Sequence, residues 1–232
     1  MVWLGGFLSD MEGTKATALD SMMARTGQAY LRFDYAGHGN SPGRLEDASI
    51  SGWRADTLFA LDTLSQGPLV VIGSSMGAWM ALLALKARPE RVAGLVLLAP
   101  APDFTAKLLW PSLPAEQRAR IDAGLREELP ATTERGAFPL TKKFFVDGAT
   151  HNVLDEPIPF GGPVRILHGL DDGDVPWSHA LAVAEAIESP DLTLTLIKGA
   201  EHRLSTPADI ARLEACLAEI LAAIGSTNSG RL

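Results

Sequence analysis

The sequence predicts an α/β fold in which a mostly parallel sheet is covered by helices on both faces. Short apolar runs bounded by turn residues alternate along the chain with longer segments of helical periodicity. Several of these runs are apolar at consecutive positions, as in strands buried on both sides. Ligands of such folds bind beyond the carboxyl ends of the strands, so we expect the functional residues in those loops.

The elements follow from these two patterns. Strands are expected at the apolar runs that end in turn residues, which are Met1–Leu4, Gln28–Phe33, Leu69–Ile72, Val92–Leu98, Val164–Leu167 and Leu192–Ile197. Helices are expected where apolar residues recur at helical spacing, which is the case for Thr14–Arg25, Ile50–Leu64, Met76–Ala87, Ser178–Ile187 and Pro207–Ile224.

One segment, residues 103–163, interrupts the alternation. It shows no convincing strand pattern and is broken by repeated prolines, and it is too long for a simple loop. Its helix-like pieces are Ala115–Leu129 and Leu140–Asp147. We therefore predict a core formed by residues 1–102 and 164–224, with 103–163 inserted as a cap. Residues 225–232 are rich in Gly, Ser and Asn, and we expect them to be a flexible tail.

Composition excludes several classes of function. The chain has 232 residues, of which 47% are apolar, enough for a substantial buried core. Its 20 basic and 28 acidic residues give a net charge of −8, which disfavours nucleic acid and anionic membranes as partners. No apolar run is long enough to span a bilayer, so no membrane insertion is expected. The first residues lack a basic region typical of a signal peptide. A single cysteine, Cys216, excludes an internal disulfide framework and predicts a cytoplasmic protein.

The strongest chemical signal is the segment Gly73-Ser74-Ser75-Met76-Gly77. It ends a buried strand and leads directly into a helix, the context that a Gly-x-Ser-x-Gly nucleophile elbow requires. The sharp turn strains the central serine and leaves no room for side chains two residues away on either side. The same five-residue pattern also occurs in ordinary glycine turns, but the flanking strand and helix favour Ser75 as a nucleophile.

A serine hydroxyl is a weak nucleophile and needs a general base, which in turn needs an orienting acid. In this architecture the chain order is serine, acid, histidine, each in a loop after a strand. The loop after Val164–Leu167 contains Asp171, Asp172 and Asp174, and one of these is the expected acid. The loop after the last strand contains His202, which we predict to be the base.

The remaining histidines have simpler interpretations. His38 lies in a glycine turn and His168 ends a strand, where each is expected to form local hydrogen bonds. His179 is early on a helix, and His151 in the cap could touch a substrate. The aspartate cluster lacks the ligand spacing of a calcium loop, so we expect no metal site.

An acyl-transfer site also needs two backbone N–H groups directed at the developing oxyanion. We predict that one is the N–H of Met76 and that the other is the N–H of Phe7, in the loop after the first strand. The simpler interpretation of Gly5-Gly6-Phe7-Leu8 is a glycine turn with Phe7 in the core.

The residues quoted above, together with Asp34-Tyr35-Ala36-Gly37-His38-Gly39-Asn40-Ser41, resemble an α/β-hydrolase with a short cap, over residues 1 to 224. Within that superfamily, residues 6–16, Arg32-Phe33-Asp34-Tyr35, Trp53-Arg54 and Val175-Pro176-Trp177 are similar to the α/β-hydrolase-domain protein ten group. That group is named for palmitoyl-protein thioesterase and acyl-glucuronide esterase activity. The resemblance implies a catalytic Ser75, Asp172 and His202, selecting Asp172 among its neighbours, with an oxyanion hole at Phe7 and Met76.

The resemblance also implies a difference at the start of the sheet. Members of the family have two strands before the one expected at Met1–Leu4, and nothing precedes that strand in this sequence, which is expected either from a truncated sequence or from a smaller sheet. We therefore expect Gln28–Phe33 to form an exposed edge strand, with the chemistry intact and the stability reduced.

The resulting hypothesis is a cofactor-free serine hydrolase acting on a small-molecule ester or thioester, or on an S-acylated protein. Apolar cap residues could line an acyl pocket: Phe104, Leu108, Leu109, Trp110, Phe138, Phe144 and Phe145. The alternatives are cleavage of another bond by the same triad, such as a C–C or peptide bond or a perhydrolase reaction, and a non-catalytic binding protein on the same fold.

Overall fold

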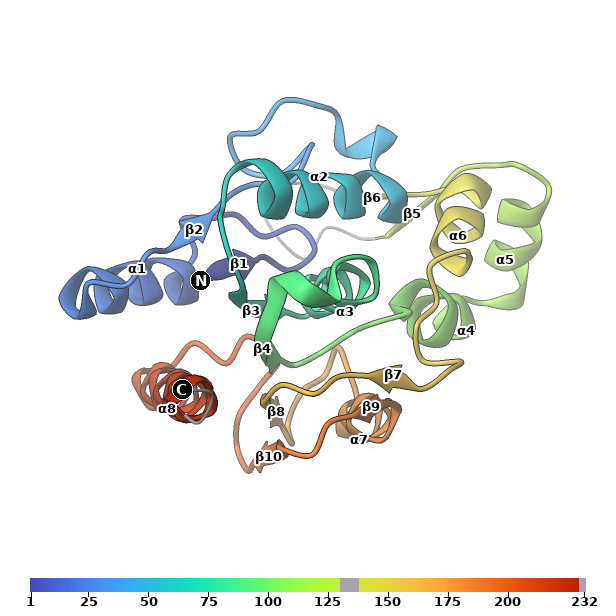
Figure 1. Ribbon diagram of the computed structural model, residues 1–232. Coiled ribbons are helices and arrows are strands. Elements are labelled where there is room, and N and C mark those ends of the chain that lie inside the picture. The colour runs from blue at the N-terminus through green and yellow to red at the C-terminus, as the bar shows by residue number, and fades with distance from the viewer. Residues whose placement is uncertain (130–137, 230–232) are drawn as a thin grey trace.

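A twisted sheet of parallel strands forms the centre of the molecule (Figure 1). The computed structural model describes residues 1–129 and 138–229. Within that part of the chain the main sheet has six strands in the order β10-β8-β4-β3-β1-β2, and every neighbouring pair is parallel. The predicted mostly parallel α/β architecture is therefore confirmed.

The strands of the main sheet are β1 (Val2–Leu4), β2 (Leu31–Arg32), β3 (Leu69–Ser74), β4 (Val92–Leu98), β8 (Val164–Gly169) and β10 (Leu192–Ile197). The helices that pack on it are α1 (Thr14–Thr26), α2 (Ile50–Thr63), α3 (Met76–Ala87), α7 (Trp177–Ala186) and α8 (Pro207–Ser229). Short 3-10 turns occur at η1 (Leu45–Asp47) and η2 (Pro89–Arg91).

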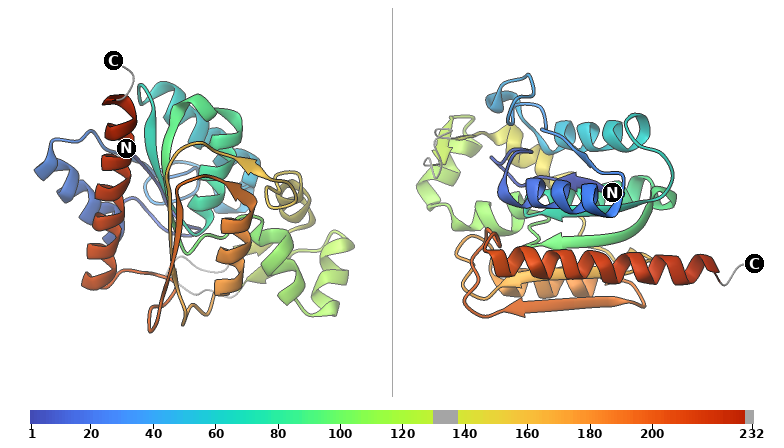
Figure 2. Two further views of the ribbon diagram at one scale, coloured as in Figure 1. Left: turned by 60° about the horizontal axis from the view of Figure 1, so that its bottom comes forward. Right: turned by 90° about the vertical axis from the view of Figure 1, so that its left-hand side faces the viewer.

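Helices cover both faces of the sheet. Helices α1 and α8 lie side by side on one face, and α2, α3 and α7 lie on the other (Figures 1 and 2). Each face has its own apolar cluster, because strands such as β3 are buried along their whole length and alternate their side chains between the two. Helix α3 is buried almost all round, so the element that follows Ser75 is held rigidly.

The expected strands are all present, and the differences occur at the edges of the sheet. Strand β2 covers only Leu31–Arg32, because its single partner β1 offers a short pairing surface. Helix α8 continues through Ser229, so residues 225–229 are helical where the sequence predicted a tail without regular structure. Propagating an established helix costs little free energy, even through poor helix formers. Residues 230–232 lie outside the described part.

No helix in the described ranges combines the length and apolar character needed to cross a bilayer.

Residues 103–163 contain more strand than expected. They form η3, a π-helical turn (Thr105–Leu109), then α4 (Trp110–Ser112), α5 (Ala115–Asp122), β5 (Glu127–Leu129), β6 (Phe138–Leu140), α6 (Lys142–Ala149) and β7 (Ile158–Pro159). The expected helix over Ala115–Leu129 is wrong in its second half: Gly124, at a φ of 85°, follows the end of α5, and β5 then pairs with β6. Strand β7 pairs with β9 (Ile187–Glu188), which binds the segment to the core.

The sheet topology reverses direction between β1 and β3. The chain goes from β1 outward to β2, then returns to place β3 on the other side of β1 and continues through β4 and β8 to β10. Leu4 is the register partner of Gly73, so the loop after β1 and the turn after β3 begin side by side. This is the switch point at which α/β folds form their ligand sites.

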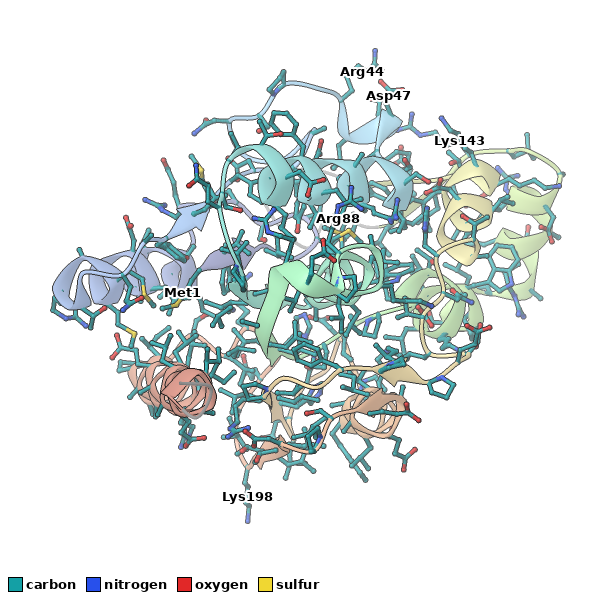
Figure 3. All side chains as sticks on the ribbon, in the orientation of Figure 1. Met1, Arg44, Asp47, Arg88, Lys143 and Lys198 are labelled. Carbon is teal, nitrogen blue, oxygen red and sulfur yellow. The ribbon has the colours of Figure 1, made fainter. Side chains whose placement is uncertain are left out.

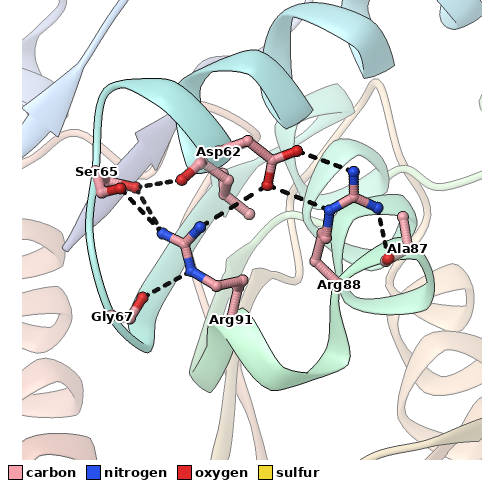
Figure 4. A network of polar contacts seen from close by, with 7 residues as sticks. Asp62, Ser65, Gly67, Ala87, Arg88 and Arg91 are labelled. Carbon is pink, nitrogen blue, oxygen red and sulfur yellow. Dashed lines mark hydrogen bonds and ion pairs between the residues drawn. The ribbon is translucent and has the colours of Figure 1, made fainter.

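A polar network lies at the start of β3, at the edge of the sheet opposite the switch point. Asp62, at the end of α2, pairs with Arg88 at 2.9 Å and with Arg91 at 3.8 Å (Figure 4). The Arg91 Nε donates to the Gly67 carbonyl oxygen at 2.8 Å, just before β3. The network thereby holds the end of α2 and the end of α3 near the start of β3.

The backbone packing at the switch point leads to a stability prediction. A Cβ at position 77 would lie 2.0 Å from the Leu4 carbonyl oxygen, whereas one at Gly161 would meet no atom within 4 Å. Gly77→Ala should therefore lower the free energy of unfolding by about 3 kcal/mol, and Gly161→Ala by less than about 0.5 kcal/mol. Urea unfolding followed by circular dichroism measures both; equal stability of the two variants would contradict the close approach.

Candidate active site

Ser75 lies at the tip of a strained turn between β3 and α3. Its backbone has a φ of 54° and a ψ of −118°, a region that residues with side chains rarely adopt. Its N–H donates to the Leu98 carbonyl oxygen at 2.8 Å, which ties the turn to the end of β4. A Cβ at Gly73 would lie 2.5 Å from the Gly77 carbonyl oxygen. The two flanking glycines are thus required by backbone contacts, as the motif predicted.

The structure brings Ser75, His202 and Asp172 together from three strand ends. The Nε2 atom of His202 lies 3.0 Å from the Ser75 Oγ, and its Nδ1 lies 2.8 Å from the Asp172 Oδ2. His202 follows β10 and Asp172 follows β8, so the strand order carries both to the carboxyl edge of the sheet. The Asp172 side chain is completely buried, whereas 21% of the His202 side chain is exposed. A substrate could therefore reach the His202 imidazole, while the Asp172 carboxylate remains shielded from solvent.

Local hydrogen bonds explain why Asp172, and not another aspartate of its loop, faces His202. The Asp172 Oδ1 accepts the N–H groups of Asp174 at 2.9 Å and Val175 at 2.8 Å, which fixes the carboxylate inside its own turn. Burial raises the pKa of Asp172, but the hydrogen bonds from His202 and from these amides outweigh burial and lower it below its ordinary value. Asp171 and Asp174 are exposed.

The loop after β1, which the sequence placed near the oxyanion, passes beside Ser75. A Cβ at Gly6 would lie 3.4 Å from the Ser75 Cβ, so the backbone leading to Phe7 passes in contact with the serine. The next residue, Leu8, has a φ of 57°, and its N–H donates to the His38 Nε2 at 3.1 Å. The predicted hydrogen-bonding role of His38 is confirmed, with a partner directly after Phe7.

Of the other histidines, His168 touches this chain of contacts, with its Nε2 3.4 Å from the Asp172 Oδ2. The His168 Nε2 hydrogen-bonds the Val175 carbonyl oxygen at 2.9 Å, which supports the acid loop, as predicted. The His179 Nε2 lies 2.8 Å from the Pro102 carbonyl oxygen. Burial lowers the pKa of both imidazoles. The His151 Nε2 lies 2.7 Å from the Ser51 Oγ, joining the segment after α6 to α2.

One group of side chains in the described ranges has donors spaced as metal ligands would be. Asp172, Asp174 and His202 offer ligand atoms within 4.8 Å of one another. The His202 Nδ1 and the Asp172 Oδ2 are, however, 2.8 Å apart, the distance of a direct hydrogen bond. A cation would have to break that bond, so the donor set fits an orienting acid and its histidine better than a metal centre.

An aromatic cluster surrounds Phe7, in the loop after β1. The Phe7 ring packs against Phe138 at 4.7 Å and against Phe104 at 5.8 Å between ring centroids. Phe104 in turn contacts Trp79 at 5.7 Å, and Phe138 contacts Phe144 at 5.0 Å. Phe138 and Phe144 are buried, whereas Phe104 is half-buried. Of the apolar residues named from the sequence, Phe138 and Phe144 are therefore core residues of this cluster, and Phe104 keeps some exposed surface.

Sequence reasoning gave no role to two residues that hold the site's loops. The Asp34 carboxylate accepts the N–H of Met11 at 2.7 Å and of Asn40 at 2.9 Å, joining the loop after β1 to the loop after β2. The Lys15 ammonium donates to the Arg203 carbonyl oxygen, next to His202. Both lie in segments that carried the family resemblance, but neither has a local pattern that indicates its partner.

Comparison with known proteins identifies the family of the chain. A model of the family described as the alpha/beta hydrolase fold matches residues 15–136. The chain is 39% identical over 211 residues to the rat palmitoyl-protein thioesterase ABHD10, covering 90% of this chain and 71% of the relative. It superposes on mouse alpha/beta hydrolase domain-containing protein 10 with a TM-score of 0.87 at 37% identity, over 95% and 88% of the two chains. A putative hydrolase from Agrobacterium vitis gives a TM-score of 0.88 at 40% identity, over 94% and 86%.

The cytoplasmic placement expected from the sequence is wrong. The rat relative and its mouse, bovine, orangutan and human counterparts are named mitochondrial proteins. A lone cysteine such as Cys216 argues against an oxidising compartment, but it does not distinguish one reducing compartment from another.

The family model, the sequence identities and the superpositions all point to one family. The chain therefore belongs to the α/β-hydrolase family and is related to its ABHD10 branch.

Proposed function

We propose that this chain hydrolyses acyl esters or thioesters through a covalent acyl-enzyme on Ser75. The observation that carries the proposal is the continuous hydrogen-bonded chain from the Ser75 Oγ through both nitrogens of His202 to the Asp172 carboxylate. Relatives named palmitoyl-protein thioesterases support an acyl thioester as one substrate. A small-molecule ester or thioester and an S-acylated protein share the acyl carbon that this site would attack.

In the acylation step the Ser75 Oγ attacks the acyl carbon and His202 takes the hydroxyl proton at Nε2. The imidazolium then gives this proton to the departing alcohol or thiol. Asp172 holds the Nδ1 proton and stabilises the positive charge, which its lowered pKa permits because the carboxylate stays ionised at neutral pH. Water, activated by the same histidine, releases the acyl group and restores the serine. These steps need no cofactor.

The tetrahedral intermediate would place its oxyanion between the N–H groups of Met76 and Phe7. Met76 begins α3, so its N–H is among the unpaired donors of a helix start, where negative charge is favoured. Phe7 follows Gly6, whose lack of a side chain lets the backbone lie against Ser75. The contacts of Leu8 with His38 and of Met11 with Asp34 hold this loop in place before substrate binds.

The acyl chain would lie along the aromatic cluster next to Phe7. Phe104 is the member that is only half-buried and contacts both Phe7 and Trp79. It therefore offers apolar surface to a chain extending from Ser75 toward the cap.

Substitution of the nucleophile tests the reaction class. Ser75→Ala should lower kcat by at least about 10³-fold on p-nitrophenyl acetate, p-nitrophenyl octanoate and a palmitoyl thioester, and should abolish labelling by a fluorophosphonate probe. Ser74→Ala, one residue away on β3, is the matched control and should keep both. Full labelling of the Ser75→Ala protein would contradict the assignment.

The choice of acid is tested by two amide substitutions in one loop. Asp172→Asn should lower kcat by about 10³-fold or more, because the amide cannot hold the productive His202 tautomer or stabilise its charge. Asp171→Asn should keep kcat within about threefold, since this exposed side chain lies outside the hydrogen-bonded chain. Steady-state kinetics on p-nitrophenyl acetate measures both, and equal losses would refute the assignment of Asp172.

The acyl-chain path is tested by Phe104→Ala. Loss of this ring should lower kcat/KM for a palmitoyl thioester by about tenfold and change it for acetate by less than about twofold, because only the long chain reaches the ring. Phe59→Ala, at an exposed position on α2, is the control. Equal losses on both substrates would show that Phe104 supports the fold and not the chain.

A further inference from the structure

The loop that carries His202 is anchored firmly at both ends. At its start, the Ala200 carbonyl oxygen accepts the Asp171 N–H at 3.0 Å, which joins it to the acid loop. At its end, the Thr206 N–H and hydroxyl donate to the Asp209 carboxylate at 3.1 and 2.6 Å, forming the cap of α8. Its middle residues face an open cavity of about 440 Å³. The position of His202 therefore depends on how that middle part is held.

Lys15 reaches the middle of the loop from α1. Its ammonium donates to the carbonyl oxygen of Arg203 and lies 3.4 Å from the Ser205 Oγ. Between these two residues, Leu204 has a φ of 45° and buries its side chain. A strained residue keeps such a conformation only when its neighbours hold it, and Lys15 contacts the residue on each side.

Lys15 is also close in sequence to the proposed oxyanion loop. It is the second residue of α1, and the loop leading into that helix contains Phe7. The Lys15 ammonium therefore links α1, which follows the proposed oxyanion loop, to Arg203, which follows the proposed base His202. We infer that Lys15 is a positioning residue: its ammonium holds the Arg203 carbonyl so that His202 reaches both Ser75 and Asp172. This inference rests on the proposed function.

Desolvation of the Lys15 ammonium offsets the stabilisation that its contacts with the loop provide. Burial, and then the nearby Arg203 guanidinium, lower the pKa of Lys15 to about 8, and Asp209, which also pairs with Arg212, offsets only part of this. The folded protein therefore holds a charge that prefers water, and removing it should not reduce stability. His202 needs two hydrogen bonds at once, at 3.0 and 2.8 Å, and small displacements of catalytic groups cost rate steeply.

The test compares Lys15→Met, which keeps the length and removes the donor, with Lys15→Arg, which keeps a charged donor. Lys198→Met is the matched control, because Lys198 starts the same loop and its side chain points away from the molecule (Figure 3). We expect Lys15→Met to lower kcat on p-nitrophenyl acetate by about tenfold or more, with KM within about twofold and an unchanged or higher Tm. Lys15→Arg should recover kcat to within about threefold.

The pH profile gives a second readout that loss of packing would not produce. Above about pH 8 the Lys15 ammonium loses a proton, and the neutral amine is a weaker donor to the Arg203 carbonyl oxygen, so wild-type kcat should fall as the pH rises through about 8. In Lys15→Arg this alkaline fall should be absent, because a guanidinium stays protonated.

Three results would overturn the inference: a Lys15→Met kcat equal to that of Lys198→Met, equal losses in the Met and Arg variants, or the same alkaline fall in wild type and Lys15→Arg. Failure of the proposed function itself would be recognised separately, by wild-type turnover that survives in Ser75→Ala, and would remove both proposals.

Discussion

Close backbone packing between the end of β1 and the turn after β3 is the constraint on which the rest of the site depends. Position 77 has no room for a Cβ, because one would lie 2.0 Å from the Leu4 carbonyl oxygen. This contact allows the Ser75 turn to sit directly beside the Gly6–Phe7 backbone, and buried α3 holds the strained turn from the other side. The strain at Ser75 persists because both surrounding segments fix it.

From that turn, the sheet topology assembles the remaining groups. The parallel strands β8 and β10 end at the same edge as β3, so the loops that follow them can meet Ser75. The Asp172 side chain is fully buried but stays ionised. Hydrogen bonds from the backbone amides of its own loop and from the His202 ring lower its pKa. The outer layer of support comes from His38, Asp34 and Lys15, each of which fixes a loop through one or two polar contacts.

Local rules made Ser75 and the strand ends predictable from the sequence. The glycine spacing around Ser75 reflects contacts within a few residues, and the alternation of strands and helices placed the acid and the histidine in strand-end loops. Choosing Asp172 over Asp171 required the family resemblance, because the deciding contacts are amide hydrogen bonds inside one turn. The Lys15 contact was not predictable: it joins residues 188 apart in the sequence and has no periodic signal. The β5–β6 pairing was missed because each strand has only three residues.

The central claim is that the acyl group passes through a covalent ester on Ser75. Rapid acid quenching during turnover of a palmitoyl thioester, followed by peptide mass spectrometry, tests it most directly. We expect a palmitoyl mass increment on the peptide containing Ser75, formed before the steady state and lost when substrate is exhausted. Acylation of a residue other than Ser75, or turnover at the same rate in Ser75→Ala, would contradict it.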